Sequence, residues 1–486
     1  MHLIQRSLLQ AVVVLVAAFS VLQSHAQGEH MVFAHYMVTN QDYVGDDGQN
    51  QEAKISAYER EIQQAQSIGI DGFALNVGGW LRETYYIRYT AEIFEAAVRL
   101  HSNFKLMFSA DMCCGNDAAD VEDMMRRFAG NPRYRNVYFQ HDGKFVLTTF
   151  AGDKLGIAAW EQIRSDLATG SHPSLATEPK ALPEVAASPS NAPLPIFFTP
   201  AFFWGGELPK LPAVEEGLKQ WRSTLDGAFY WGIAGVPGSS GDLDQLRSSA
   251  AYATALHGDG KLYMAPICLQ FWGANANRYF EYSGGAGMGA MWKQAIETTH
   301  PEWVEIITWN DFIEGTYISP IDDPNRYPQA NFLTGTGVPA GTLGYFHEHG
   351  EADGLMRYYI RWYKTGVKPV IDHDQIYVFY RTQSKEASAG KPPVAHQYGP
   401  VADLIYVTAL LREPATLEVG SGGKVTTLPL SAGKTEVSAP FAVGSEPDFR
   451  LQRGDRVVLS GAGADRIQRA PRYNDFYYSI RELSAP

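Results

Sequence analysis

The sequence predicts an α/β fold, a (β/α)8 barrel followed by a C-terminal antiparallel β-sandwich. Short apolar runs alternate eight times with segments whose hydrophobic residues recur every 3.6 positions. This alternation is typical of a parallel sheet covered by helices. Polar and aromatic residues follow many of the apolar runs, at the ends where a barrel carries its site. From about Gly366 the pattern changes to short strand-like runs separated by turns, which indicates the sandwich.

The first 26 residues have the pattern of a secretory signal peptide. Arg6 supplies the basic end, residues 11–19 form an apolar core, and Ser24-His25-Ala26 is a small-x-small cleavage site. The apolar core is too short to span a bilayer comfortably. We therefore expect the protein to be exported, into the extracellular medium or, in a bacterium, the periplasm, with no membrane partner.

Eight strands and eight helices are predicted for the barrel, which we place at residues 27–366. The strands are expected at 32–37, 72–77, 105–112, 144–150, 196–203, 228–234, 261–268 and 303–309. The helices are expected at 53–68, 90–101, 121–128, 157–167, 214–221, 243–256, 291–299 and 355–363. A doubly wound open sheet also alternates strands with helices, but eight clean units favour closure into a barrel.

The β-sandwich is predicted to occupy residues 367–486. Its strand-like runs lie at 376–380, 403–409, 416–419, 424–428, 449–451, 456–459 and 476–480. Glycine clusters at 420–423 and 461–463 supply turns between several of them. Such a unit either binds polysaccharide or braces the barrel, and we favour bracing.

Charge and cysteine content exclude several classes of partner. The chain carries a net charge of −13 at pH 7, which disfavours nucleic acid and anionic membranes and fits a neutral polymer.

Three cysteines in an exported chain of this size do not make a disulfide framework. We expect Cys113, Cys114 and Cys268 to be buried free thiols rather than a vicinal disulfide. No run has the spacing of a zinc or calcium site, so no metal is expected. The oligomeric state stays open.

The strongest functional signal lies at the end of the eighth apolar run. Asp311 and Glu314 follow this run directly, with Trp309 and Tyr317 on either side. Hydrolysis of a glycosidic bond needs two carboxyl groups, one to protonate the leaving oxygen and one to activate water or attack. Aromatic rings beside them would hold the sugar. The pattern therefore predicts a pair of catalytic carboxylates.

The same residues permit a structural interpretation. Asn310 or Asp311 can cap a helix, with Glu314 completing a capping box. The spacing nevertheless suits catalysis, because three residues of extended chain reach about 10 Å at most. A turn would shorten this towards the roughly 6.5–9.5 Å that admits a water molecule in inverting glycosidases.

Other candidates come from the ends of the predicted strands. Asp111, after the third strand, is a further catalytic candidate, and its alternative role is to cap the turn after Met112. An aromatic residue on a barrel strand belongs to the core as often as it contacts sugar. The predicted substrate-binding residues are His35, Asn76, Trp204, Trp231, Trp309, Asn310 and Tyr317.

Four short runs of the chain follow a known family pattern. They are VFAHYM at 32–37, DGFALN at 71–76, KLMFSADM at 105–112 and TWNDFIE at 308–314. On these runs the chain resembles glycoside hydrolase family 71, the α-1,3-glucanases often called mutanases. The resemblance extends to residues 376–381 and so covers most of the mature chain. The acidic run with its tryptophan is its most specific part.

The resemblance implies a barrel with a β-sandwich, a polysaccharide substrate and no cofactor. It also implies endo-hydrolysis of α-1,3-glucan with inversion, with Asp311 and Glu314 as the catalytic pair. We assign Glu314 as the acid and Asp311 as the base. Gly315 stands where the family commonly has serine, and the adjacent cysteines are also unusual; both bear on substrate preference. The alternatives are hydrolysis of another polysaccharide by the same pair, or a carbohydrate-binding barrel without catalysis.

Overall fold

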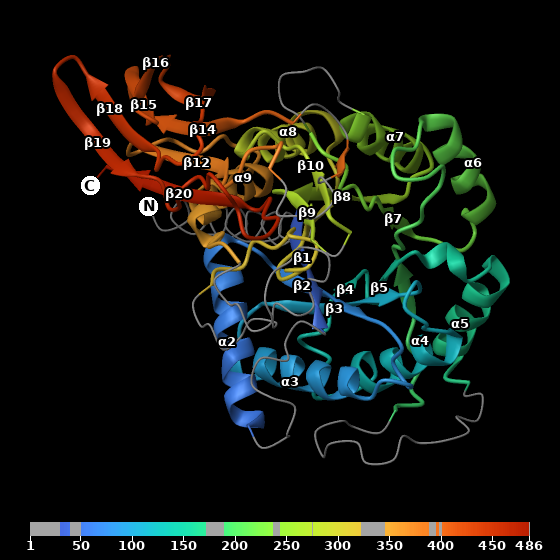
Figure 1. Cartoon of the computed structure of the whole chain (residues 1–486). Coiled ribbons are helices and arrows are strands. Elements are labelled where there is room, and N and C mark those ends of the chain that lie inside the picture. The colour runs from blue at the N-terminus through green and yellow to red at the C-terminus, as the bar shows by residue number, and fades with distance from the viewer. Residues whose placement is uncertain are drawn as a thin grey trace, which may run out of the picture.

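The computed structural model describes residues 30–38, 50–171, 189–236, 244–274, 276–321, 346–387, 395–397 and 401–485. The predicted signal peptide lies outside these residues. Elements are labelled as in Figure 1, which shows the parallel strands at the centre, helices around them, and the C-terminal strands to one side. In the described ranges, none of the helices has both the length and the apolar character needed to cross a membrane.

The central sheet contains the eight predicted parallel strands. In chain order they are β1 (Met31–Met37), β2 (Gly72–Val77), β3 (Lys105–Asp111), β5 (Lys144–Phe150), β6 (Ile196–Phe198), β7 (Gly227–Phe229), β8 (Leu262–Cys268) and β11 (Trp303–Ile307). Their order across the sheet is β6-β5-β3-β2-β1-β11-β8-β7, and the short β4 (Gln140–His141) pairs antiparallel with β5. The sheet curls so that its two end strands approach each other. Ala201 forms a parallel bridge with Phe229, and the Phe229 amide donates to the Pro200 carbonyl at 2.9 Å.

Two strands are shorter than predicted. We expected 196–203 and 228–234, whereas β6 ends at Phe198 and β7 at Phe229. Pro200 has no amide proton to donate to a ladder, and beyond it, among the described residues, only the isolated bridge from Ala201 to Phe229 joins the two strands. Regular pairing therefore stops early in both strands, and the chain beyond them is free to form the loops at the carboxyl end of the sheet.

Helices follow the strands as the periodicity predicts. They are α2 (Gln51–Ile68), α3 (Tyr85–Leu100), α4 (Ala118–Met124), α5 (Ile157–Thr169), α6 (Leu211–Trp221), α7 (Asp244–Gly258), α8 (Gly285–Gln294) and α9 (Asp353–Thr365). One π-helical turn at Met125–Ala129 continues α4, and another at Ala295–Thr299 continues α8. Helix α2 ends at Gly69, whose φ of +102° suits glycine and where a Cβ would lie 2.8 Å from Ile360 of α9.

Alternation along the strands separates the interior of the curled sheet from its helix-covered side. In β1, Phe33 packs inside against Trp303, with ring centroids 6.0 Å apart. His35, two residues on, lies on the same side and meets Glu305 of β11. Tyr36 points the other way, where its hydroxyl donates to Glu61 of α2. Because alternate residues of a strand share a face, the interior is apolar at the amino ends of the strands and becomes polar towards their carboxyl ends.

The C-terminal region forms two four-stranded antiparallel sheets. One has the order β17 (Gly433–Pro440), β14 (Leu404–Leu411), β12 (Gln375–Arg381), β20 (Tyr478–Ser484). The other has the order β16 (Lys424–Leu430), β15 (Ala415–Ser421), β18 (Asp448–Arg453), β19 (Arg456–Ala462). Ile376, Val407, Leu417 and Leu451 are among the residues of the apolar core between them. A third small sheet joins β9 (Phe271–Gly273), β10 (Arg278–Phe280) and β13 (Ala395–Gln397).

The first C-terminal sheet also packs on the barrel. Tyr377, Phe379 and Ile480 belong to the same apolar cluster as the parallel strands and their helices. At Gly285 of α8 a Cβ would lie only 3.0 Å from the Phe379 ring. The sheet is therefore buried on both faces, as expected of a unit that braces the barrel, and Figure 1 shows it beside α8 and α9.

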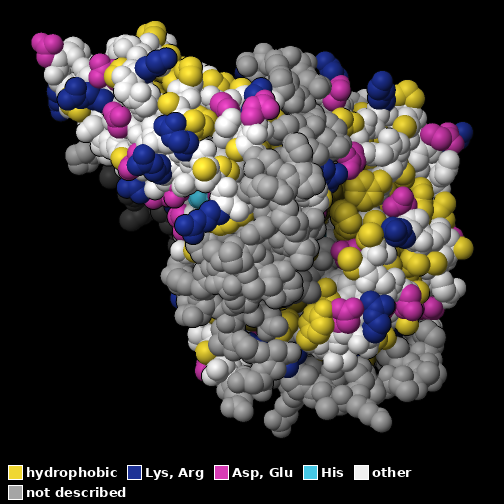
Figure 2. Space-filling view, viewed as in Figure 1, with side chains coloured by type: hydrophobic (Ala, Val, Ile, Leu, Met, Phe, Trp, Pro, Cys, Tyr) yellow, Lys and Arg dark blue, Asp and Glu magenta, His cyan; other side chains and the backbone are white. Residues whose placement is uncertain are grey.

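Surface charge is mixed on the face drawn in Figure 2. Acidic and basic side chains are interspersed there over the C-terminal sheets and over the helices on the opposite side of the molecule. This described part of the surface offers no broad basic patch of the kind that binds a polyanion.

Candidate active site

The chain beyond β11 forms a compact turn, residues 308–316, that carries both predicted acids and is called the acidic turn below. The Thr308 amide donates to the Thr316 carbonyl at 3.0 Å, and the Thr316 amide donates to the Asp311 carbonyl at 3.2 Å. The Thr308 hydroxyl accepts from the Asp311 amide at 2.8 Å. No helix begins here, so the capping-box interpretation is wrong. The turn instead holds Asp311 and Glu314 three residues apart at the carboxyl end of β11.

Asp311 is a buried carboxylate with strong hydrogen-bond support. Its side chain is 8% exposed, and its Oδ1 accepts from the amides of Ile313 (3.1 Å) and Glu314 (3.0 Å). Burial raises the pKa of Asp311 above its usual value, while these amides and nearby His35 oppose the rise. Hydrogen bonds donated to a carboxylate favour its ionised form. Of the two acids, Asp311 is thus the one equipped to stay charged.

The surroundings of Glu314 instead favour its protonated form. Burial, followed by the negative charge of Asp311, raises the pKa of Glu314 to about 8, and Arg278 opposes this rise. Its side chain keeps some exposure, and no described residue donates a hydrogen bond to its carboxyl oxygens. Two acids that interact share one proton, and here Glu314 is the better place for it. The surroundings therefore favour the proton on Glu314 over Asp311, the kind of difference that general acid–base catalysis requires of its two groups.

His35 of β1 and Trp231, which follows β7, contact each other. His35 Nδ1 lies 2.7 Å from Glu305 Oε1, and both side chains are fully buried. The imidazole lies edge-on to Trp231 with ring centroids 4.6 Å apart, and Trp231 also contacts Phe150 at 4.9 Å. His35 Nε2 has no partner among the described residues, and Trp231 is partly exposed. Contact of these two residues with a sugar stays a prediction: His35 is fully buried, and Trp231 has a partly accessible ring.

Asn76 and Asp111 lie together on β2 and β3. Asn76 Nδ2 is 3.4 Å from Asp111 Oδ2, and Asp111 Oδ1 accepts from the amides of Cys113 (2.9 Å) and Cys114 (3.2 Å). Asp111 thus caps the turn after β3, as its alternative role predicted. Asp311 accepts from the amides two and three residues further on in the same way. Capping therefore does not separate the two residues, and a catalytic role for Asp111 stays a prediction.

The adjacent cysteines are free, as predicted, but they are exposed rather than buried. Although Cys114 is exposed as a residue, the surrounding chain partly shields its thiol from solvent, and this desolvation together with the charge of Asp111 raises the pKa of Cys114 to about 12. A thiol that stays protonated is a poor nucleophile. Cys268, at the end of β8, is free and buried, which agrees with its prediction.

Two predicted substrate-binding tryptophans are core residues. Trp309 is 1% exposed and packs 5.4 Å from Phe73, on the helix-covered side of the sheet. Trp204 stacks on Tyr252 of α7 at 5.8 Å, and Gly217 of α6 packs closely against its ring. Both predictions are corrected, because these rings lie among helices and leave no face for a sugar.

Asn310 and Tyr317 support the turn. The Asn310 side chain accepts from the Met37 amide (2.7 Å) and donates to the Met37 carbonyl (3.1 Å), which ties the acidic turn to β1. Tyr317 is fully buried, stacks on His349 at 4.1 Å and donates to the His347 carbonyl. Both side chains are buried and hydrogen-bonded to backbone groups, so both predictions of substrate contact are corrected to positioning roles.

Sequence reasoning missed two residues near Glu314. Arg278 of β10 lies over the rings of Phe271 (5.2 Å) and Phe280 (4.8 Å), and its charge reaches Glu314. Glu207, before α6, also acts on the pKa of Glu314. Neither belongs to a recognisable motif. The aromatic residues around Arg278 were the only available signal in the sequence.

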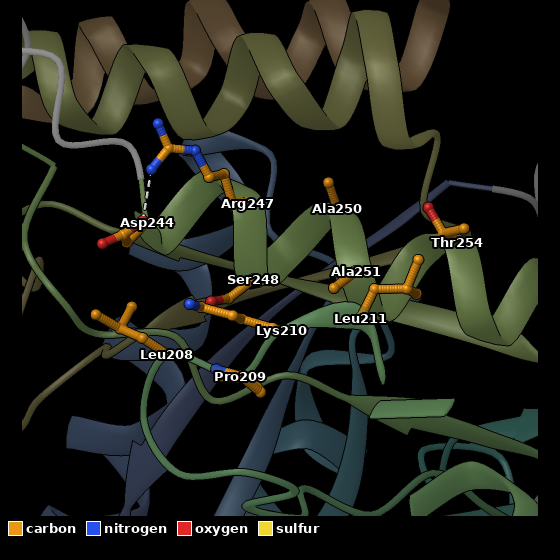
Figure 3. Close-up of a pocket in the computed structure, with 10 residues that line it drawn as sticks. All are labelled: Leu208, Pro209, Lys210, Leu211, Asp244, Arg247, Ser248, Ala250, Ala251 and Thr254. Carbon is orange, nitrogen blue, oxygen red and sulfur yellow. Dashed lines mark hydrogen bonds and ion pairs between the residues drawn. The ribbon is translucent and has the colours of Figure 1, made fainter. Parts of the chain in front are cut away.

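A cavity of about 550 Å³ lies on the β6–α6 side of the molecule (Figure 3). Its walls come from the loop before α6, the first residue of that helix, and α7, where Asp244 pairs with Arg247 at 2.5 Å. Neither Asp311 nor Glu314 lines it. Leu208 in its wall follows Glu207, whose charge acts on the pKa of Glu314.

Comparisons with known proteins cover nearly the whole chain. The sequence profile of Glycosyl hydrolase family 71 matches residues 28–484. Glucan endo-1,3-alpha-glucosidase agn1 of Schizosaccharomyces pombe is 28% identical over 474 residues, which are 96% of this chain and 98% of the relative. Mutanase Pc12g07500 of Penicillium rubens is 26% identical, over 91% of this chain and 86% of the relative. The ascus wall endo-1,3-alpha-glucanase of Schizosaccharomyces pombe is 24% identical, over 84% and 88%.

Proposed function

Because the chain belongs to glycosyl hydrolase family 71, we propose that it cleaves α-1,3-glucan inside the polymer, with Asp311 and Glu314 as the catalytic pair. Its relatives carry the names of endo-1,3-α-glucanases and a mutanase. The observation that carries the proposal is electrostatic. Both acids lie in one turn after β11, and the charge of Asp311 helps to keep the proton on Glu314, so the two groups differ in their tendency to hold a proton.

The proposed reaction is a single displacement with inversion. Glu314 donates its proton to the glycosidic oxygen as the bond to the anomeric carbon breaks. Asp311 accepts a proton from water, whose oxygen attacks the anomeric carbon from the other face. The products are a new reducing end and a free hydroxyl. Glu314 ends ionised and Asp311 protonated, and solvent restores both.

His35 and Trp231 are the proposed contacts to the sugar beside the scissile bond. A ring such as that of Trp231 packs on the apolar face of a pyranose. His35 Nε2 is buried and has no hydrogen-bond partner among the described residues, so a sugar hydroxyl that reaches it would satisfy it. Asn76, next to Asp111 at the end of β2, is proposed as a further contact.

The proposed architecture and location follow the same family. Residues 27–366 form a closed (β/α)8 barrel, which the bridge from Ala201 to Phe229 supports, and residues 367–486 form the sandwich. We propose that residues 1–26 direct export, because an insoluble cell-wall or matrix glucan lies outside the membrane.

The proposal is tested by measuring reducing sugar released from α-1,3-glucan by the parent, Asp311→Asn and Glu314→Gln. Loss of an acid or base costs about 10²–10⁴-fold in rate, so we expect both variants to fall by at least 10²-fold. Sizing the products shows endo action, and NMR of the first anomer released shows inversion or retention.

Other outcomes separate the alternatives. Activity of the parent on other glucans only would contradict the linkage. Polymer binding without product, unchanged by either substitution, would leave a carbohydrate-binding barrel as the explanation.

A further inference from the structure

The C-terminal region reaches the acidic turn through one buried tyrosine. Tyr477 immediately precedes β20 and is fully buried, and its hydroxyl donates to the carbonyl of Phe312. Phe312 lies between Asp311 and Glu314 in the chain. The orientation of its peptide therefore affects the directions of both catalytic side chains.

A second connection reaches the other end of the turn. The Tyr478 amide donates to Gln270 Oε1 at 2.8 Å, and Gln270 Nε2 donates to the Gly315 carbonyl at 2.6 Å. Gln270 is fully buried. Consecutive residues of the C-terminal region thus hold the carbonyls on both sides of Glu314, one directly and one through Gln270.

The packing at Gly315 shows how closely the tyrosine ring approaches. Gly315 has a φ of +61°, and a Cβ there would lie 2.7 Å from Tyr477 Cε1 and 2.9 Å from the Trp272 carbonyl oxygen. Both the backbone conformation and the ring require glycine at this position. The glycine that stands in place of the family's common serine therefore makes room for Tyr477.

We propose that Tyr477 is a positioning residue for the catalytic pair, and that the C-terminal sheets are consequently part of the active site. This inference rests on the proposed function of Asp311 and Glu314. Proton transfer depends on geometry held within fractions of an ångström. A hydrogen bond to the peptide between the acid and the base keeps that geometry fixed.

The test is the substitution Tyr477→Phe, which removes one hydroxyl and keeps the ring. We expect kcat on α-1,3-glucan to fall about 10–100-fold with less than a twofold change in KM, because the loss affects the reaction step and not binding. We also expect the basic limb of the pH profile to move to lower pH, because a displaced Glu314 is better solvated and gives up its proton more easily.

Tyr363→Phe is the matched control. Tyr363 is also buried, and its hydroxyl donates to the Pro301 carbonyl at 2.8 Å, near the opposite end of β11. Removing it deletes a comparable bond without touching the acidic turn, so kcat and the basic limb should stay at the parent values. Gln270→Leu removes the second connection and should reproduce the pattern of Tyr477→Phe.

The inference would be overturned if Tyr477→Phe kept the parent kcat and the parent position of the basic limb of the pH profile while Asp311→Asn was inactive. Unfolding of Tyr477→Phe while Tyr363→Phe stays folded would also overturn it, since the role would then be structural. If Asp311→Asn itself keeps full activity, the proposed catalytic pair fails, and that result is distinct from failure of the tyrosine.

Discussion

Raising the pH through 8 is expected to remove the proton from Glu314 and with it the hydrolytic activity. With a pKa of about 8, the acid is roughly nine-tenths protonated at pH 7 and roughly one-tenth at pH 9, so the rate should fall about tenfold between them. A glutamic acid at the ordinary value of 4.5 would be only about 0.3% protonated at pH 7. The two cases differ by about 300-fold in available acid.

The assay is kcat/KM for a soluble α-1,3-linked oligosaccharide from about pH 5 to about pH 9, with circular dichroism at each pH to show that the protein stays folded. The limbs of this profile report the groups of the free enzyme. Glu314→Gln provides the control, because its residual rate should show no step near pH 8. The acid limb should lie above the usual range of an aspartic acid, since burial raises the pKa of Asp311.

A basic limb below about pH 6 in the folded parent would refute this reasoning, because it would mean that the acid loses its proton near the ordinary value of a glutamate. A limb near pH 8 that persists in Glu314→Gln would assign that limb to another group.

Three further predictions use the surroundings of the turn. Arg278→Gln removes the charge that lowers the pKa of Glu314, so the basic limb should move to higher pH; a shift to lower pH would contradict this. Trp231→Ala should raise KM for oligosaccharides about 2- to 13-fold, which corresponds to a loss of about 0.5–1.5 kcal/mol of binding free energy, measured by initial rates, with the melting temperature as the control for folding. Burial lowers the pKa of His347, but Asp475 and Asp465 outweigh it and raise the pKa to about 10. The contribution of this charged histidine to the free energy of unfolding is fully present below pH 6.5, the ordinary pKa of the group, and is lost as the pH rises through about 10. Breaking such a buried pair costs about 3 kcal/mol, so urea unfolding of His347→Gln should show that loss at pH 6 and a smaller one at pH 10. Equal losses at both would contradict the ion pair.

Hydrophobic periodicity was enough to predict the parallel strands, because a buried strand and an amphipathic helix differ in period over their whole length. All eight strands lie where the apolar runs predicted them, and α9 ends at Gly366. The lengths of β6 and β7 were wrong because Pro200 limits pairing locally, an effect that the apolar character of residues 196–203 concealed.

The site could be predicted only in part. Asp311 and Glu314 were recognisable because both follow one strand within a few residues. The side on which Trp204 and Trp309 lie was not, since it depends on how the chain turns after the last paired residue. Tyr477 and Gln270 are far from the acidic turn in sequence, and single-sequence patterns carry no information about such contacts.

The most direct test of the central claim is a comparison of leaving groups. In the proposed mechanism Glu314 protonates the departing oxygen. Glu314→Gln should therefore lose at least about 10²-fold on α-1,3-glucan yet hydrolyse an α-glycoside with a dinitrophenolate leaving group at nearly the parent rate. Asp311→Asn, which lacks the base, should lose activity on both substrates. Equal losses on both substrates in Glu314→Gln would contradict its role as the acid.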